Sequence, residues 1–159
     1  MEPINSQKDL YVDFLLDMYN AEILQITALR DYEKRTDNPK LKQLLHRHVS
    51  ETRGQMLRLE DIVEGLDESL LHEHCRTMKS MIDETNELID RCTTDELRDW
   101  AIAASVQRIN HCEITVYEML LSMAEFLEAS KYIELLKKSL EEEISFENDI
   151  EELIDFQPV

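Results

Sequence analysis

The sequence predicts an all-α protein: a four-helix bundle of two antiparallel helix pairs joined by a long crossover that contains a shorter helix. Apolar residues recur at steps of three and four along four long segments, which is the spacing of one helical face. Only 2 Gly and 3 Pro interrupt the 159 residues, so few long elements need to stop. With 43% hydrophobic and 33% charged residues, we expect amphipathic helices around one core and a single domain over residues 1–159.

The first helix pair is predicted over residues 7–35 and 39–64. Ser6 immediately precedes the first periodic segment. Pro39 follows a short polar stop signal and suits the first turn of the second helix. Gly65 follows the second segment and is predicted to cap its C-terminus. Because the connection is short, the two helices should lie side by side and antiparallel.

The second half of the chain predicts a crossover and then another pair of helices. Residues 66–94 are less regular and indicate at least one shorter helix within the crossover. Thr94 precedes acidic residues, as at a helix start, and the third long helix is expected over residues 95–128. A tight break near Ser130 leads to the fourth, expected over residues 131–155. Two hairpins joined by a long crossover make the ferritin-like variant of the four-helix bundle.

The charge and cysteine content exclude several classes of function. The chain has 17 basic and 35 acidic residues and a formal net charge of −18. Such a surface repels phosphate backbones and anionic lipid, so neither nucleic-acid nor membrane binding is expected. The chain has no apolar run long enough to span a bilayer and no signal-peptide pattern at its start, so we expect a cytoplasmic protein. Three cysteines without a Cys-x-x-Cys pair argue against a disulfide framework or a zinc ribbon.

Four glutamates, Glu22, Glu51, Glu113 and Glu143, interrupt the apolar faces of the four long segments, one on each. Glu113 is the only charge in a stripe formed by Ile102, Val106, Ile109, Val116, Leu120, Met123 and Leu127. Two helical hairpins that each bring a pair of these acids to one level would place all four together. An ionised carboxylate among aliphatic side chains is costly unless it is paired, protonated or bound to a cation. The sequence therefore predicts a metal site in the bundle core.

Further polar side chains lie one helical turn from these glutamates on the same faces, namely His48, Gln55, Glu147 and, as a supporting partner, Gln25. We expect the four glutamates to be direct ligands and His48, Gln55 and Glu147 to supply the remaining positions. Carboxylate and imidazole donors suit iron and manganese. Di-iron bundles place a histidine three residues after a glutamate on two helices. Here those positions hold Gly54 and Phe146, which leaves an oxygen-rich site, an altered iron site or a layer that no longer binds metal.

Two other groups of donor side chains have less support as metal sites. His111 lies two residues before Glu113 and therefore on a different helical face, which favours packing or a dimer contact. Residues 72–75, with the sequence His-Glu-His-Cys, fall in the crossover without a ligand spacing. We expect these four residues to form a solvated turn.

Blocks of sequence around the polar residues match those of a known family over nearly the whole chain. They comprise residues 16–22 with Gln25, residues 38–41, residues 48–55 with 58–60, residues 111–114 with Tyr117, and residues 142–143 with Glu147. On these blocks the chain resembles the YciE/YciF family of ferritin-like bacterial stress proteins. The resemblance implies a bundle related to rubrerythrins, a homodimer, a dinuclear metal centre and a role in stress. The family commonly has an acid before His111 where this chain has Asn110, which implies one carboxylate fewer at the site.

Two functions fit these features. The first is a metal-binding, ferritin-like protein of oxidative or general stress, with iron or manganese at the site and, if iron is bound, reaction with oxygen or peroxide. No rubredoxin-like cysteine pairs are present to deliver electrons, which argues against a complete rubrerythrin-type peroxidase. The second is a structural or scaffolding stress protein that keeps the bundle without metal turnover and assembles with a protein partner. Enzymatic activity is left open.

Overall fold

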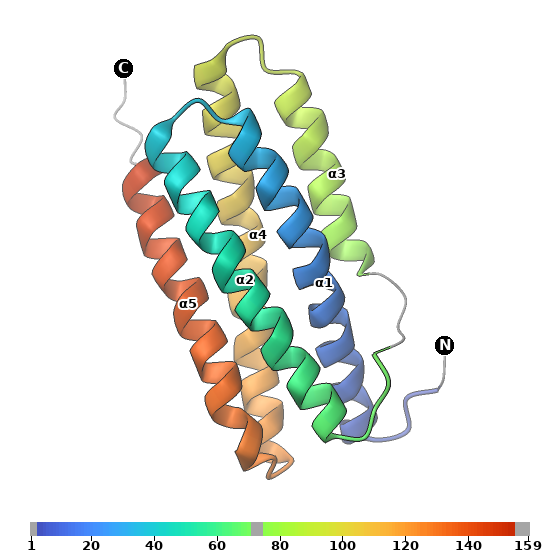
Figure 1. Ribbon diagram of the computed structural model, residues 1–159. Coiled ribbons are helices and arrows are strands. Elements are labelled where there is room, and N and C mark those ends of the chain that lie inside the picture. The colour runs from blue at the N-terminus through green and yellow to red at the C-terminus, as the bar shows by residue number, and fades with distance from the viewer. Residues whose placement is uncertain (1–2, 71–74, 155–159) are drawn as a thin grey trace.

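Four long helices run side by side in the computed structural model, which describes residues 3–70 and 75–154, and a shorter helix lies along one side of them (Figure 1). The helices are α1 (Gln7–Arg35), α2 (Pro39–Gly65), α3 (Arg76–Asp90), α4 (Asp95–Phe126) and α5 (Ser130–Ile154). Within the described ranges there is no strand. The structure confirms the all-α bundle of two helix pairs and the shorter helix in the crossover. That helix, α3, packs against α1 and α4.

The helix starts follow from local hydrogen bonding. The side-chain oxygens of Ser6, Asn38 and Thr94 accept first-turn backbone N–H groups of α1, α2 and α4 at 3.0 to 3.2 Å. These bonds satisfy donors that have no partner inside the helix. In the turn between α1 and α2, the buried Thr36 hydroxyl donates to the carboxylate of Asp99. This bond ties the first hairpin to α4.

The end of α2 differs from the cap expected at Gly65. The left-handed residue is Asp67, with φ of 61°, and the N–H of Glu68 bonds to the carbonyl of Val63 at 3.2 Å. Gly65 instead faces Tyr132 of α5, where an added Cβ would stand 2.6 Å from the tyrosine hydroxyl oxygen. Glycine at this position thus permits the close approach of α5 and does not form the turn.

The crossover runs from the end of α2 at Gly65 to the start of α4 at Asp95 and contains α3. The donor group predicted as a solvated turn includes residues 72–74, which lie outside the described residues. Its last member, Cys75, is buried, and its Sγ accepts the N–H of Met78 at 3.4 Å at the start of α3. The side chain of Cys75 therefore acts as a helix cap, and its thiol is free of disulfide bonding.

The core has two apolar zones, one toward each end of the bundle. One zone is built mainly from Tyr11, Leu15, Met18, Leu59, Ile62, Tyr117, Leu120 and Leu136. The other is built mainly from Leu29, Tyr32, Leu41, Leu45, Ile102, Val106, Phe146 and Ile150. On each long helix the stretch between these zones carries buried polar residues, which we call the polar layer: Glu22, Gln25, His48, Gln55, Asn110, Glu113 and Glu143. Water is kept from this layer by apolar packing on both sides.

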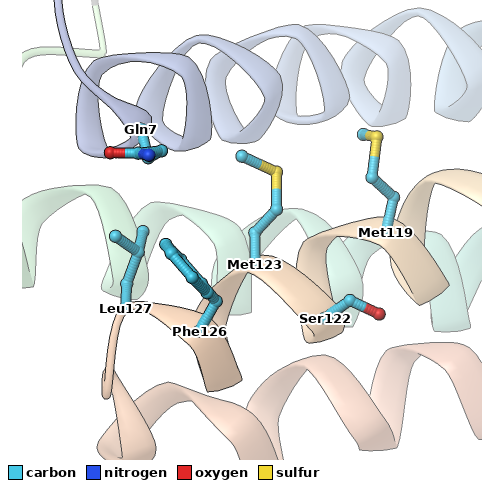
Figure 2. A pocket seen from close by; sticks show the side chains of 6 residues that line it. All are labelled: Gln7, Met119, Ser122, Met123, Phe126 and Leu127. Atoms are coloured by element: carbon cyan, nitrogen blue, oxygen red, sulfur yellow. The ribbon is translucent and has the colours of Figure 1, made fainter.

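A surface hollow of about 220 Å³ lies at one end of the bundle, away from the polar layer (Figure 2). It is lined by Gln7 at the start of α1 and by Met119, Ser122, Met123, Phe126 and Leu127 at the end of α4. None of these side chains carries a charge, so the hollow does not resemble a cation site. In the described part of the chain, no helix combines the length and the hydropathy that spanning a membrane requires.

Candidate metal centre

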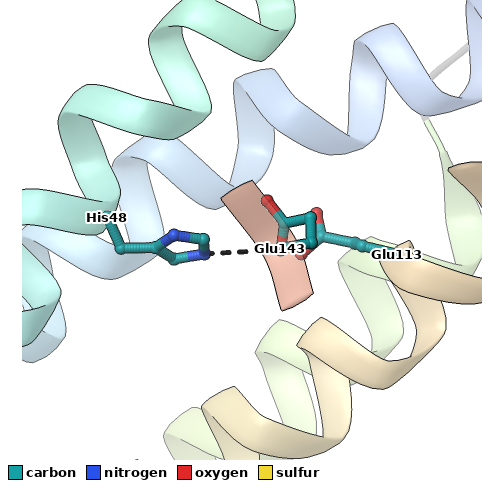
Figure 3. A group of neighbouring side chains, drawn as sticks. All are labelled: His48, Glu113 and Glu143. Carbon is teal, nitrogen blue, oxygen red and sulfur yellow. Dashed lines mark ion pairs between the residues drawn. The ribbon is translucent and has the colours of Figure 1, made fainter. Parts of the chain in front are cut away.

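Three donor side chains from three helices meet in the polar layer (Figure 3). His48 of α2, Glu113 of α4 and Glu143 of α5 each present one donor atom, and these atoms lie within 4.8 Å of one another. All three side chains are buried, with at most 1% of any residue exposed. Among the described residues, this is the only group of three or more histidine, cysteine or acidic side chains with such spacing.

The α1 side of the layer is held by two neutral donors. The Tyr117 hydroxyl donates to Oε1 of Glu22 at 2.5 Å. The Gln25 amide donates to Oε2 of Glu113 at 2.6 Å. Each contact joins α1 to α4, so each of the two carboxylates is oriented by a hydrogen bond between these helices.

On the α5 side, Glu143 is held by two further amides. Gln55 donates to Oε1 at 2.5 Å, and Asn110 donates to Oε2 and also to the backbone carbonyl of Glu143 at 3.3 Å. The sequence predicts Gln55 as a ligand, whereas Asn110 is implied at the site only by the family resemblance, as the residue that replaces a carboxylate. The spacing also indicates this position, because Asn110 lies three residues before Glu113 and so shares its helical face.

The two ring nitrogens of His48 face two different carboxylates. Its Nδ1 lies 3.3 Å from Oε2 of Glu51, and its Nε2 lies 3.8 Å from Oε2 of Glu143. The ring stacks on Phe146, with centroids 3.7 Å apart. The carboxylate at Nδ1 favours the tautomer with its proton there, which leaves the Nε2 lone pair directed inward. Metal-binding histidines commonly have this arrangement.

Glu51 lies at the edge of the layer, in contrast to the inward orientation expected for it, whereas Glu147 is buried beside the layer. The Glu51 side chain is 24% exposed, and Arg47 pairs with it at 3.3 Å. Glu147 accepts from Gln107 at 2.7 Å and lies 2.9 Å from Nε2 of His111. Arg47 thus partly balances the charge of Glu51, whereas Oε2 of the buried Glu147 has no hydrogen-bond partner. The other five residues predicted as ligands share the layer, namely Glu22, His48, Gln55, Glu113 and Glu143.

The layer contains a surplus of acceptor atoms. Six buried atoms in it have no hydrogen-bond partner: Glu22 Oε2, Gln25 Oε1, His48 Nε2, Gln55 Oε1, Asn110 Oδ1 and Glu113 Oε1. Buried polar atoms without partners are costly, and clusters of them in native proteins call for an explanation. A cation satisfies several acceptors at once. Carboxylate oxygens, amide oxygens and one imidazole nitrogen form a donor set that fits iron or manganese.

The electrostatics of the layer also favour a cation. Burial, and then the charge of Glu143, raises the pKa of Glu22 and of Glu113 well above the usual range. Burial raises the pKa of Glu143 too, although His48 and the two amides oppose the rise. Burial and Glu22 raise the pKa of Tyr117 well above its ordinary value, so this hydroxyl remains a donor. A positive ion would stabilise the ionised form of all three carboxylates.

Comparison with known proteins agrees with this architecture. The family model described as "Domain of unknown function (DUF892)" matches residues 6–157. Protein YciF of Escherichia coli strain K12 is 37% identical over 137 residues, which cover 86% of this chain and 82% of that protein. The crystal structure of the E. coli stress protein YciF superposes with a TM-score of 0.89 at 34% identity, covering 94% of this chain and 95% of that one.

A second solved structure is also similar. YcfI from Rhodopseudomonas palustris, described as a candidate structural protein, has a TM-score of 0.90 at 26% identity, covering 99% of this chain and 98% of that one. The family model spans nearly the whole chain, and the identity to YciF extends over most of it. The chain therefore belongs to the DUF892 family, which is the family of the stress protein YciF.

Proposed function

We propose that this chain is a stress protein of the bacterial cytoplasm that binds a divalent iron or manganese ion in the bundle core. The observation that carries the proposal is the group of six unpartnered acceptor atoms inside a layer that also holds three buried glutamates. Membership of the YciF family supports the stress role.

Five residues of the layer hold or orient the donors in this proposal. His48 presents Nε2, while Glu113 and Glu143 supply the negative charge that offsets the cation. Gln25 and Gln55 orient these two carboxylates through their amide N–H groups. The apolar zones above and below keep bulk water from the donors. A bound iron ion would supply one-electron chemistry toward oxygen or peroxide.

Metal analysis of protein purified without chelator tests the proposal. We expect stoichiometric iron or manganese in the wild type and less than about a tenth of that in the double variant Glu113→Gln, Glu143→Gln, because both anionic ligands are lost. The matched control is Glu118→Gln, Glu141→Gln, which removes the same charge from exposed positions on α4 and α5. Equal metal content in the two double variants would contradict a site at the polar layer.

A structural role is the second candidate. It is favoured by the similarity to YcfI, which is itself described as a candidate structural protein. In this role the bundle would assemble with another protein, and the polar layer would perform no turnover. Metal-free wild-type protein with an intact fold and a full yield of complex with its partner would favour the structural role over the metal-binding one.

We further propose that the chain forms a homodimer, as the family resemblance implies. Light scattering during size exclusion measures this directly. We expect a mass twice that of the 18.8 kDa chain, independent of added metal. A mass of a single chain at micromolar concentration would exclude a stable dimer.

A further inference from the structure

We propose that the polar layer binds one metal ion per chain, between His48, Glu113 and Glu143, and that Asn110 is the residue that limits it to one. The inference rests on the proposed metal-binding function and specifies its stoichiometry. It differs from the dinuclear centre that the family resemblance implies.

The positions of the donors support a single ion. His48, Glu113 and Glu143 have donor atoms within 4.8 Å of one another, and within the described ranges no second group of three such side chains exists. Glu22 lies outside this group, with Oε1 bonded to the Tyr117 hydroxyl. A second ion on the α1 side would have Glu22 as its only carboxylate of its own and would have to share Glu113.

Asn110 occupies the place from which a further carboxylate would complete a second site. It is fully buried on α4, one turn before Glu113. Its amide N–H group donates to both Oε2 and the backbone carbonyl of Glu143, while its own Oδ1 has no partner. The side chain therefore faces the layer but adds no negative charge. It also takes up lone pairs of Glu143 that a second ion would need.

The charges of the layer lead to the same conclusion. Three carboxylates face it, those of Glu22, Glu113 and Glu143, whereas two divalent ions would bring four positive charges. Glu51 is paired with Arg47, and Oε1 of Glu147 accepts from Gln107 and lies 2.9 Å from Nε2 of His111, so neither acid is fully available to a second ion. Excess charge in an apolar interior is costly. Dinuclear bundles offset two ions with four glutamates and two histidines.

The test is to count ions and to record their magnetic coupling. Apo protein is titrated with Mn²⁺ by equilibrium dialysis, and the electron paramagnetic resonance spectrum is recorded at one and at two equivalents. We expect one bound ion and the six-line spectrum of an isolated Mn²⁺ in the wild type. Asn110→Asp, which is nearly isosteric, should bind two ions and show a spin-coupled spectrum. The matched control Ala104→Asp adds the same charge at an exposed position on α4 and should bind one.

The possible outcomes separate this inference from the function on which it rests. Two coupled ions in the wild type would overturn the single-ion site and leave metal binding intact. No bound ion in the wild type would overturn both. A single ion in Asn110→Asp would overturn the limiting role of Asn110. If that variant does not fold, the wild-type spectrum at two equivalents decides alone, because a coupled signal contradicts the inference and an isolated one supports it.

Discussion

At the scale of single residues, the polar layer is organised by neutral donors. Gln25, Gln55 and Asn110 each direct an amide N–H group at a carboxylate, and Tyr117 directs its hydroxyl at Glu22. Each amide thereby leaves its own oxygen without a partner. The donors thus hold the carboxylates in place without neutralising them, which keeps the negative charge available to a cation.

The bond between Tyr117 and Glu22 should contribute measurably to stability. Tyr117→Phe removes the 2.5 Å bond and leaves Oε1 of Glu22 buried without a partner. We expect the free energy of unfolding to fall by about 1–3 kcal/mol, measured by urea denaturation in the presence of chelator. Tyr132→Phe is the control, because the Tyr132 hydroxyl is buried and has no partner. An equal fall in the free energy of unfolding of both variants would show that the bond to Glu22 stabilises the protein no more than a buried hydroxyl without a partner does.

Glu51 should act on metal affinity through His48. Glu51→Gln weakens the acceptor that faces Nδ1 of His48 at 3.3 Å, so the imidazole is held less firmly in the orientation that presents Nε2 to the layer. We expect Mn²⁺ affinity to fall about 10–100-fold with the number of bound ions unchanged. The control is Asp149→Asn, because Asp149 also pairs with Arg47 but is not a hydrogen-bond partner of His48. A lower number of bound Mn²⁺ ions per chain in Glu51→Gln would instead indicate that Glu51 is a direct ligand.

At the scale of elements, two helices end in left-handed residues that are not glycine. Asp67 follows α2 with φ of 61°, and Glu128 follows α4 with φ of 55°. After α4, the N–H of Ala129 bonds to the carbonyl of Ala124 at 2.9 Å, which is the long bond of a Schellman motif. Aspartate visits the left-handed region more readily than glutamate. The strain is therefore greater at Glu128, in the turn that joins α4 to α5.

Replacing Glu128 by glycine should stabilise the protein. Glycine adopts the left-handed conformation without the steric cost that a Cβ imposes. We expect a gain of about 0.5–1 kcal/mol, seen as a rise of about 1–4 °C in Tm. The control Glu125→Gly places glycine inside the last turn of α4, where it should destabilise by about the same amount. A gain from both variants would point to relief of surface charge and not to backbone strain.

At the scale of the whole molecule, the polar layer makes stability depend on pH. Glu22, Glu113 and Glu143 have raised pKa values in the folded protein, because their charged forms are buried near one another. In this range the folded state binds more protons than the unfolded state, so the free energy of unfolding falls as pH rises. The loss begins above the ordinary carboxyl pKa of 4.5 and continues through the raised pKa values. A bound cation would stabilise the ionised carboxylates and so oppose this loss of stability.

Thermal melts with and without metal should show this linkage. The apo protein is expected to have a higher Tm at about pH 5 than at about pH 8, and saturating Mn²⁺ should raise Tm most at the higher pH. Glu143→Gln should weaken metal binding and flatten the pH dependence of the apo protein, because one of the mutually repelling acids is gone. The exposed Glu141→Gln serves as the control. Identical melts for the apo and metal-loaded wild type would show that the layer holds no ion.

Much of the fold could be predicted because the starts, ends and faces of helices depend on residues that are close together in the sequence. The expected first helix, residues 7–35, matches α1, and the end of α2, the end of α4 and the start of α5 differ from expectation by one or two residues. Ser6 and Thr94 cap helices as their positions indicated. The sequence predicts Gly65 as the cap of α2, yet glycine is needed there because the Tyr132 side chain leaves no room for a Cβ. That contact joins α2 to α5, and no local pattern carries it.

The bundle, the crossover and a polar layer at one level of four helices can be predicted from the sequence, because helical periodicity fixes which residues share a face. Which side chains of the layer meet depends on the packing of the helices. His48 and Gln55 occupy the centre of the inward face of α2, so Glu51 falls at its edge and pairs with Arg47. The direction of a side chain at the edge of a face depends on how the helix is rotated against its neighbours. Packing between helices sets that rotation, and it brings the amide of Asn110 to Glu143.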